Sequence, residues 1–130
     1  YSFFCQLEKS NHIKLFEGSH GYDDGEQRRD FIHVEDTNKV KKWLMHNNVS
    51  GIFNVGTGKS RSFNDVAKNV ISVLKKGRIE YIEFPDGLKE QYQSYTQADM
   101  SNLINSGYDN DFLSLEEGIE RYVKWLESHK

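Results

Sequence analysis

Six apolar residues recur every three or four positions between residues 63 and 74, and this stretch constrains the fold more than any other. The spacing places all six on one face of an α-helix, which has to be buried against other elements. Ser62 precedes the helix as a capping residue, and Asp65 lies in its first turn, where the helix dipole favours an acid. The residues of this face are Phe63, Val66, Ala67, Val70, Ile71 and Leu74.

Strand signals precede and follow this helix. Residues 12–16 alternate as a half-exposed strand does, and residues 51–55 form a short apolar run that ends at a glycine turn. Residues 29–34 have an extended pattern, and residues 79–84 form another strand that stops at Pro85. The glycine- and acid-rich residues 17–27 between them have little to bury, which predicts a loop.

Further helices separate these strands. We expect one in the first residues, one capped by Asp36, a short one after Asp99, and a last one opened by the capping box of Ser114 and Glu117. We expect the Phe63 helix to continue until Gly77. The alternation predicts an α/β class, here an α+β-like lobe with few short strands and about four helices. No strand followed by a glycine-rich loop and a helix opens the chain as a dinucleotide-binding core does.

Composition excludes several classes of function. Seventeen basic and twenty acidic residues give a net charge of -3 without a basic block, which argues against a nucleic-acid partner. No run approaches the roughly 20 apolar residues of a membrane-spanning helix. The single Cys5 excludes an internal disulfide and suits the cytoplasm. The chain starts at Tyr1 without a Met, so we expect it to be part of a longer protein.

The run Gly56-Thr57-Gly58-Lys59-Ser60 invites comparison with a phosphate-binding loop. Such a loop needs a glycine five positions before its Gly-Lys pair, where this chain has Phe53. A strand-to-helix turn that needs glycine dihedrals is the better interpretation. The chain also lacks Gly-x-Gly-x-x-Gly and Tyr-x-x-x-Lys, and its five histidines lack metal-ligand spacing. We therefore predict no catalytic residue, no cofactor site and no metal site within it.

A few residues are suited to binding. A turn after the first strand would expose backbone donors and the Ser19 hydroxyl. Arg29, where the loop rejoins a strand, has a planar guanidinium that can bind a diphosphate with two hydrogen bonds. Its neighbour Arg28 has the plainer interpretation of a solvated surface charge. Tyr92 and Tyr95 could stack on a sugar or base, although core or surface filling explains them equally well.

Read together, these segments resemble the C-terminal part of the ADP-heptose 6-epimerase family, within the extended short-chain dehydrogenase/reductases. The similar segments cover nearly the whole chain. Arg-Asp-Phe at 29–31 and Asn-x-Gly-x-Gly at 54–58 are shared by many sugar-nucleotide epimerases and dehydratases. Lys-Leu-Phe-Glu-Gly-Ser at 14–19 and Tyr-Thr-Gln-Ala-Asp at 95–99 are typical of the heptose enzymes.

The resemblance implies a function and its residues. The family interconverts ADP-D-glycero- and ADP-L-glycero-D-manno-heptose by transient oxidation at C6'' with NADP, for the inner core of lipopolysaccharide. It implies that Arg29 holds the substrate's diphosphate. The other implied substrate contacts are Phe16, Glu17, Gly18, Ser19 and Tyr92.

The resemblance also implies an arrangement of domains. Residues 1–130 would be a single substrate-binding domain, and a separate N-terminal Rossmann domain would hold NADP and the catalytic Tyr and Lys. This chain alone would then be inactive, and the whole protein would be a cytoplasmic homo-oligomer.

Two alternatives stay open at this point. The shared motifs also permit the substrate domain of another sugar-nucleotide epimerase, dehydratase or reductase. A non-catalytic binding module is the alternative from another class, and its partner surface would be Phe3, Phe4, Cys5 and Leu7.

Overall fold

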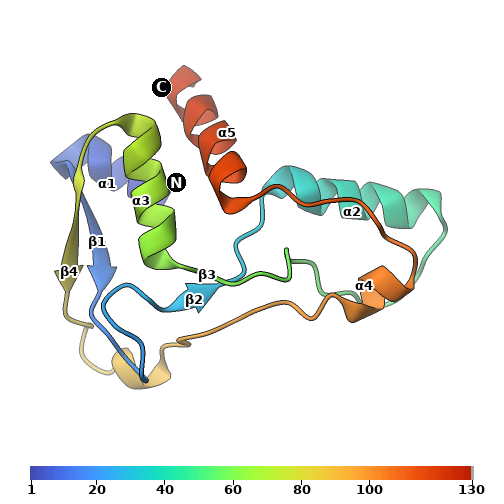
Figure 1. Cartoon of the computed structure of the whole chain (residues 1–130), viewed down its shortest axis with the longest axis horizontal. Coiled ribbons are helices and arrows are strands. Elements are labelled where there is room, and N and C mark those ends of the chain that lie inside the picture. The colour runs from blue at the N-terminus through green and yellow to red at the C-terminus, as the bar shows by residue number, and fades with distance from the viewer. Residues whose placement is uncertain (130) are drawn as a thin grey trace.

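The larger of two apolar cores forms around a pair of parallel strands. In the computed structural model, which describes residues 1–129, β1 (His12–Phe16) pairs with β4 (Arg78–Ile82), and Ile13 lies opposite Ile79. Helices α1 (Ser2–Ser10), α3 (Phe63–Leu74) and α5 (Leu115–Ser128) complete this core (Figure 1). Its buried residues are Phe4, Leu7, Ile13, Leu15, Ala67, Val70, Val123 and Leu126.

A second, smaller core lies at the other end of the molecule, between α2 (Val34–His46) and α4 (Ser101–Asn105) (Figure 1). Val40, Met100, Leu103 and Tyr108 are its buried residues. The ring of Trp43 meets Tyr108 edge-on, with 5.4 Å between ring centroids. The two cores are therefore built from different helices, and the segments between them have to hold them together.

Those connecting segments contain two very short strands. β2 (Arg28–Arg29) and β3 (Arg61–Ser62) pair antiparallel, with Arg28 opposite Ser62. The stretch after β4 carries one 3-10 turn, η1 (Lys89–Gln91), and then runs alongside β2 through a parallel bridge between Arg28 and Tyr95. This region is the middle of the molecule.

Several expected helix boundaries agree with the structure and two differ. The capping boxes at Ser62 and Ser114 are both formed, each with its acid three residues later. The expectation that Asp36 caps α2 is wrong, because the helix starts at Val34 with His33 as its cap. α3 ends at Leu74 and not at Gly77, because Lys75 already adopts the left-handed conformation, with a φ of 52°.

The strand expected at residues 51–55 is not formed. Within the described residues this segment pairs with no strand, and the side chain of Ile52 is 92% exposed. A strand needs a neighbour for its backbone N–H and C=O groups, and both β1 and β4 lie in the other core. Apolar sequence alone therefore leaves this segment extended but unpaired.

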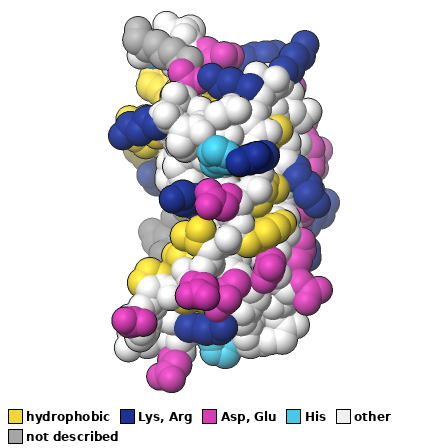
Figure 2. Space-filling model, turned by 90° about the vertical axis from the view of Figure 1, so that its left-hand side faces the viewer, with side chains coloured by type: hydrophobic (Ala, Val, Ile, Leu, Met, Phe, Trp, Pro, Cys, Tyr) yellow, Lys and Arg dark blue, Asp and Glu magenta, His cyan; other side chains and the backbone are white. Residues whose placement is uncertain are grey.

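The surface carries both signs of charge. Figure 2 shows basic and acidic side chains interspersed with apolar ones on the face that carries α1, β1 and β4. None of the helices within residues 1–129 has the length and apolar character needed to cross a membrane. The predicted α/β class, with few short strands, is confirmed.

Candidate functional site

Loop 17–27 is tied to β1 and α3 rather than loose. The N–H of Gly25 donates to the carbonyl of Phe16 over 3.0 Å. The buried Gln27 side chain donates through Nε2 to the carbonyl of Glu17, over 2.7 Å. Asn64 on α3 holds the far side of the loop by donating to the Asp24 carbonyl over 2.8 Å. The backbone around Phe16 and Glu17 is thus fixed in place.

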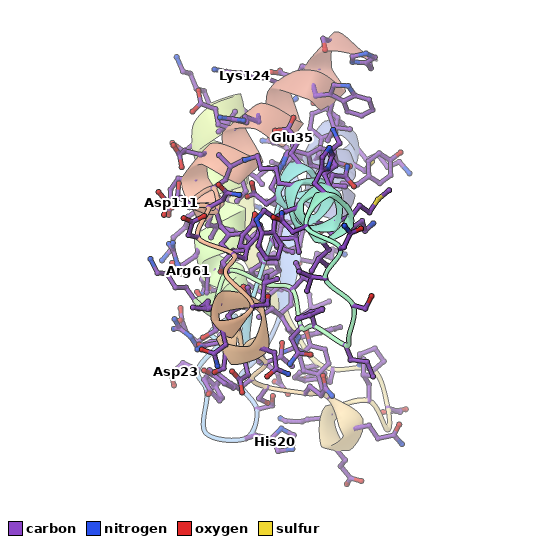
Figure 3. The ribbon with its side chains drawn as sticks, turned by 90° about the vertical axis from the view of Figure 1, so that its right-hand side faces the viewer. His20, Asp23, Glu35, Arg61, Asp111 and Lys124 are labelled. Atoms are coloured by element: carbon purple, nitrogen blue, oxygen red, sulfur yellow. The ribbon has the colours of Figure 1, made fainter. Side chains whose placement is uncertain are left out.

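Gly18 and Ser19 face the interior of this loop. The Gly18 N–H donates to Asp24 Oδ1 over 2.7 Å, and Ser19 is only 5% exposed. The Ser19 hydroxyl lies 3.4 Å from that of Ser94. The expected exposure of the hydroxyl is therefore wrong, because Ser19 is buried against Ser94 and Gln27, and the Gly18 N–H already has an acceptor within the loop. Figure 3 places His20 and Asp23 at the outer tip of the loop, at the end of the molecule opposite Lys124 on α5.

Three aromatic rings form what we call the aromatic cluster, Phe16, Phe84 and Tyr92. Phe16 and Phe84 stack with 4.5 Å between centroids, and Tyr92 meets them edge-on at 5.6 Å and 5.1 Å. These are favourable aromatic geometries. The residues come from the end of β1, the segment after β4 and the end of η1. Phe16 and Tyr92 are predicted site residues, whereas nothing in the sequence pattern predicts a role for Phe84.

Arg29 lies against this cluster. Its guanidinium carbon is 5.3 Å from the centre of the Tyr92 ring and 5.7 Å from that of Phe63. Its terminal nitrogens donate to the Arg28 carbonyl, over 2.8 Å, and to the Gln93 carbonyl. A guanidinium has five N–H donors, so three remain without a partner among residues 1–129. The group is held in one orientation and still able to bind an anion.

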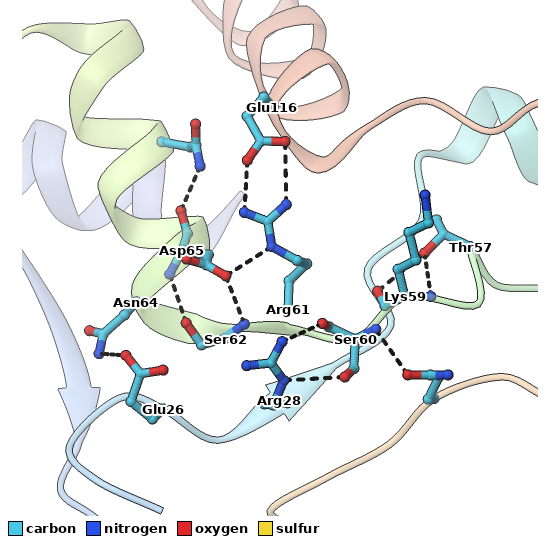
Figure 4. Close-up of polar contacts among 12 residues, drawn as sticks. Glu26, Arg28, Thr57, Lys59, Ser60, Arg61, Ser62, Asn64, Asp65 and Glu116 are labelled. Atoms are coloured by element: carbon cyan, nitrogen blue, oxygen red, sulfur yellow. Dashed lines mark hydrogen bonds and ion pairs between the residues drawn. The ribbon is translucent and has the colours of Figure 1, made fainter.

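Arg28 has a different role from its neighbour. Its Nε lies 3.2 Å from the Ser60 hydroxyl, and a terminal nitrogen donates to the Ser60 carbonyl over 2.7 Å (Figure 4). The interpretation as a solvated surface charge is therefore wrong. Arg28 joins β2 to the segment before β3, which leaves Arg29 as the arginine beside the aromatic cluster.

A second cation lies at the edge of the cluster and was missed in the sequence. Lys89 Nζ is 2.8 Å from Glu17 Oε1 and 5.9 Å from the centre of the Phe84 ring. Tyr95, in contrast, is half-exposed and lines a different hollow, together with Gln97 and Ile104. Its hydroxyl donates to the Gln97 side chain over 2.8 Å. The structure therefore brings Tyr92, and not Tyr95, to the arginine.

The glycine turn at 56–58 binds an internal carboxylate. Asp30 accepts the backbone N–H groups of Thr57 at 2.8 Å and of Gly58 at 2.9 Å. Gly58 has a φ of 72°, as the turn interpretation requires. Because these donors are occupied, the turn does not fit the phosphates of a nucleotide or dinucleotide. No group of three potential metal ligands occurs among the described residues.

This fold is that of the C-terminal portion of short-chain dehydrogenase/reductase-type epimerases. The Helicobacter pylori ADP-L-glycero-D-manno-heptose-6-epimerase superposes with a TM-score of 0.80 and 27% identity, over 98% of this chain and 37% of that one. An NAD-dependent NDP-hexosamine 5,6-dehydratase of tunicamycin biosynthesis superposes with a TM-score of 0.80 over 99% of this chain and 40% of that one, at 24% identity. The latter likeness shows the fold alone.

Curated relatives with higher identity carry one name. The chain is 52% identical to the ADP-L-glycero-D-manno-heptose-6-epimerase of Alkalilimnicola ehrlichii over an alignment of 124 positions. It is 46% identical to that of Thiobacillus denitrificans over an alignment of 142 positions. These matches cover 95% and 97% of the chain. The chain spans about two fifths of the length of these relatives, 39% and 43%. No family model matches it.

The chain is thus a homologue of part of the ADP-heptose 6-epimerases. The resemblance stated from its motifs is confirmed, for sequence and for fold. The roles of individual site residues stay predictions.

Proposed function

We propose that this chain supplies the nucleotide-sugar contacts of an ADP-heptose 6-epimerase. The observation that carries the proposal is the convergence of Phe16, Arg29 and Tyr92, which come from three separate segments. Phe16 lies in the segment that is typical of the heptose enzymes, and Arg29 lies in one that many sugar-nucleotide epimerases and dehydratases share. An oriented guanidinium beside aromatic rings suits a ligand that combines a diphosphate with a flat base.

Each residue then has a role in holding the substrate. The unoccupied N–H groups of Arg29 bind diphosphate oxygens, and the faces of Phe16 and Tyr92 pack against the base or sugar. The carboxylate of Glu17 accepts a hydrogen bond from a hydroxyl or amino group. Gly18 and Ser19 shape the turn from within. Together these contacts orient the heptose so that its C6'' faces the redox cofactor, and orientation of this kind accounts for much of catalysis.

We place the redox cofactor outside this chain. Asp30 occupies the donors of the glycine turn, and no dinucleotide-binding motif is present among residues 1–130. The nicotinamide cofactor, proposed to be NADP, and the catalytic Tyr and Lys belong to the part of the relatives that this chain does not span. When bound, the cofactor supplies hydride transfer. Residues 1–130 then form a substrate-binding domain without turnover of its own.

Nucleotide affinity in the intact gene product tests the proposal. Isothermal titration should give tighter binding of ADP than of UDP, and Arg29→Gln should weaken ADP binding about 10- to 100-fold. Arg78→Gln removes the same charge from an exposed position at the start of β4 and should leave the affinity unchanged. Preference for UDP would indicate a different sugar-nucleotide substrate. Equal affinities for ADP in the wild type and Arg29→Gln would remove Arg29 from the site.

The proposal also includes the setting of the whole protein. A heptose epimerase is expected to act in the cytoplasm, where nucleotide sugars are made, as a homo-oligomer. Sedimentation of the intact gene product tests its oligomeric state, and cell fractionation tests its location.

A further inference from the structure

Three sequence motifs of this chain meet at one side chain, the carboxylate of Asp30. Arg-Asp-Phe at 29–31 contributes the carboxylate itself. The glycine turn contributes the N–H of Thr57 at 2.8 Å, the N–H of Gly58 at 2.9 Å and the Thr57 hydroxyl at 2.6 Å. The Thr-Gln-Ala-Asp segment contributes the N–H of Ala98 at 3.1 Å. Four donors thus converge on one carboxylate.

The carboxylate of Asp30 is packed closely against Gly56. A Cβ on Gly56 would lie 2.4 Å from Asp30 Oδ2 and 2.6 Å from the Cβ of Ala98, both far inside normal contact distance. The glycine at this position is therefore required by the packing of the carboxylate. Charge-assisted hydrogen bonds to backbone N–H groups are stronger than neutral ones, so this carboxylate holds both neighbouring segments firmly.

The segments that Asp30 holds include both the backbone that carries Arg29 and the stretch whose carbonyl accepts a hydrogen bond from its guanidinium. Arg29 directly precedes Asp30, so the carboxylate fixes the backbone from which the guanidinium projects. The guanidinium donates to the carbonyl of Gln93, in the stretch that Asp30 holds five residues later through the N–H of Ala98. The same stretch runs along β2, where the Thr96 N–H donates to the Arg28 carbonyl over 3.1 Å.

We infer that Asp30 is a positioning residue for Arg29. It fixes β2, which carries Arg29, relative to the stretch with Gln93, whose carbonyl accepts from the guanidinium, and so orients the guanidinium towards the ligand. The inference rests on the proposed function, because it takes Arg29 as the group that holds the diphosphate. Asp30 itself touches no substrate, since all its oxygens face internal donors.

The first arm of the test needs no ligand. In the intact protein, the Nε–H signal of Arg29 should show high heteronuclear NOE values by NMR, and Asp30→Asn should lower them towards those of a freely rotating side chain. Asp99→Asn is the matched control, because Asp99 also accepts a backbone N–H and a hydroxyl, both from Ser101. It should leave the Arg29 signal unchanged. An Arg29 signal that stays rigid in folded Asp30→Asn overturns the inference.

The second arm separates positioning from stability. Asp30→Asn should weaken ADP binding about 10-fold but AMP binding less than about 2-fold, because the Arg29 fork serves the diphosphate. Adding Arg29→Gln to Asp30→Asn should cost less than it does in the wild type. Equal losses for ADP and AMP, with additive effects, would mean that Asp30 only stabilises the fold.

A milder variant covers the case in which Asp30→Asn does not fold. Thr57→Val removes only the hydroxyl that donates to Asp30. It should lower the NOE values of Arg29 and the affinity for ADP in the same direction as Asp30→Asn, but by less. A wild-type protein that fails to bind ADP contradicts the proposed function, whereas the NMR arm still decides the role of Asp30.

Discussion

At the scale of single residues, buried or half-buried carboxylates join segments that are far apart in the sequence. Asp30 links the glycine turn to the segment around Ala98. Asp36 is completely buried and accepts the N–H of Leu113 over 2.8 Å. Asp30 accepts mainly backbone N–H groups, whereas Asp36 accepts one backbone N–H and pairs with Lys39 at 2.8 Å through its other oxygen. Loss of either one leaves N–H groups in the interior without an acceptor, which is costly.

Gly56→Ala should be strongly destabilising. The added methyl group would overlap Asp30 Oδ2 and the Ala98 methyl group, at 2.4 Å and 2.6 Å, so we expect a loss of about 2–4 kcal/mol in the free energy of unfolding. The matched control is Gly118→Ala in α5, where the nearest atom would be 3.5 Å away and helix propensity improves. Urea denaturation of both variants checks this. Similar stability of the two would contradict the packing argument.

The ring of Tyr92, rather than its hydroxyl, should matter for binding. Tyr92→Phe keeps the edge-on contacts with Phe16 and Phe84 and the contact with Arg29, so we expect nearly wild-type ADP affinity. Tyr92→Leu removes them and should weaken ADP binding about 3- to 10-fold. Titration calorimetry on the intact protein measures both. A Phe variant as weak as the Leu variant would mean that the hydroxyl contacts the ligand.

Residue types alone identified part of this site. Arg29 and Tyr92 were found because a guanidinium and a phenol suit a diphosphate and a base wherever they lie. Phe84 and Lys89 were missed because their roles depend on distances to Phe16 and Glu17, which lie on a different segment. Ser19 was assigned an exposed hydroxyl, and only the closure of the loop shows that it is buried.

At the scale of elements, the N-termini of α3 and α5 are joined by one arginine. Arg61 Nε lies 2.9 Å from Asp65 Oδ2 on α3, and its terminal nitrogen lies 2.8 Å from Glu116 Oε1 on α5 (Figure 4). The hydrogen bond from Arg61 holds the pKa of the Glu116 carboxyl below its ordinary value. Both acids also lie in first helical turns, where a negative charge is favourable.

This pairing predicts a pH dependence of stability. Because the pKa of Glu116 is lower in the folded state, its contribution is complete above the ordinary glutamate range and is lost as pH falls through the folded pKa. The pair is half-exposed, so we expect Glu116→Gln to cost less than about 1 kcal/mol at pH 7, and progressively less as the pH falls towards about 3. Glu120→Gln, which breaks an exposed pair with Lys124 within α5, is the control. Thermal melts between these pH values would refute the idea if the difference from wild type grew on acidification.

Local signals predicted the elements better than their partners. Serine caps followed by an acid three residues later marked α3 and α5 correctly, because both halves of a capping box lie within one turn. The start of α2 was misplaced because Asp36 looks like a cap until its buried contact with Leu113 is seen. The strand expected at residues 51–55 failed because pairing needs a neighbour that no local pattern can show.

At the scale of the whole molecule, a few polar contacts connect the two cores. α2 reaches α5 and the segment before it through two polar contacts. The Asp36 carboxylate accepts the N–H of Leu113, and Glu35 pairs with Arg121 at 3.1 Å. The two cores share no buried apolar residue, so we expect the smaller core to open before the larger one.

Hydrogen exchange on Asp36→Ala tests this division. The variant leaves the N–H of Leu113 without its acceptor and Lys39 without its partner, so the free energy of opening should fall by about 2–4 kcal/mol in α2 and α4. Amides of α3 and β1 should keep their protection, because none of their hydrogen bonds involves Asp36. Glu35→Ala, an exposed acid in the same helical turn, should change little. An equal loss of protection in α3 would show that the two cores unfold as one cooperative unit, and the polar links would then be stronger than their number implies.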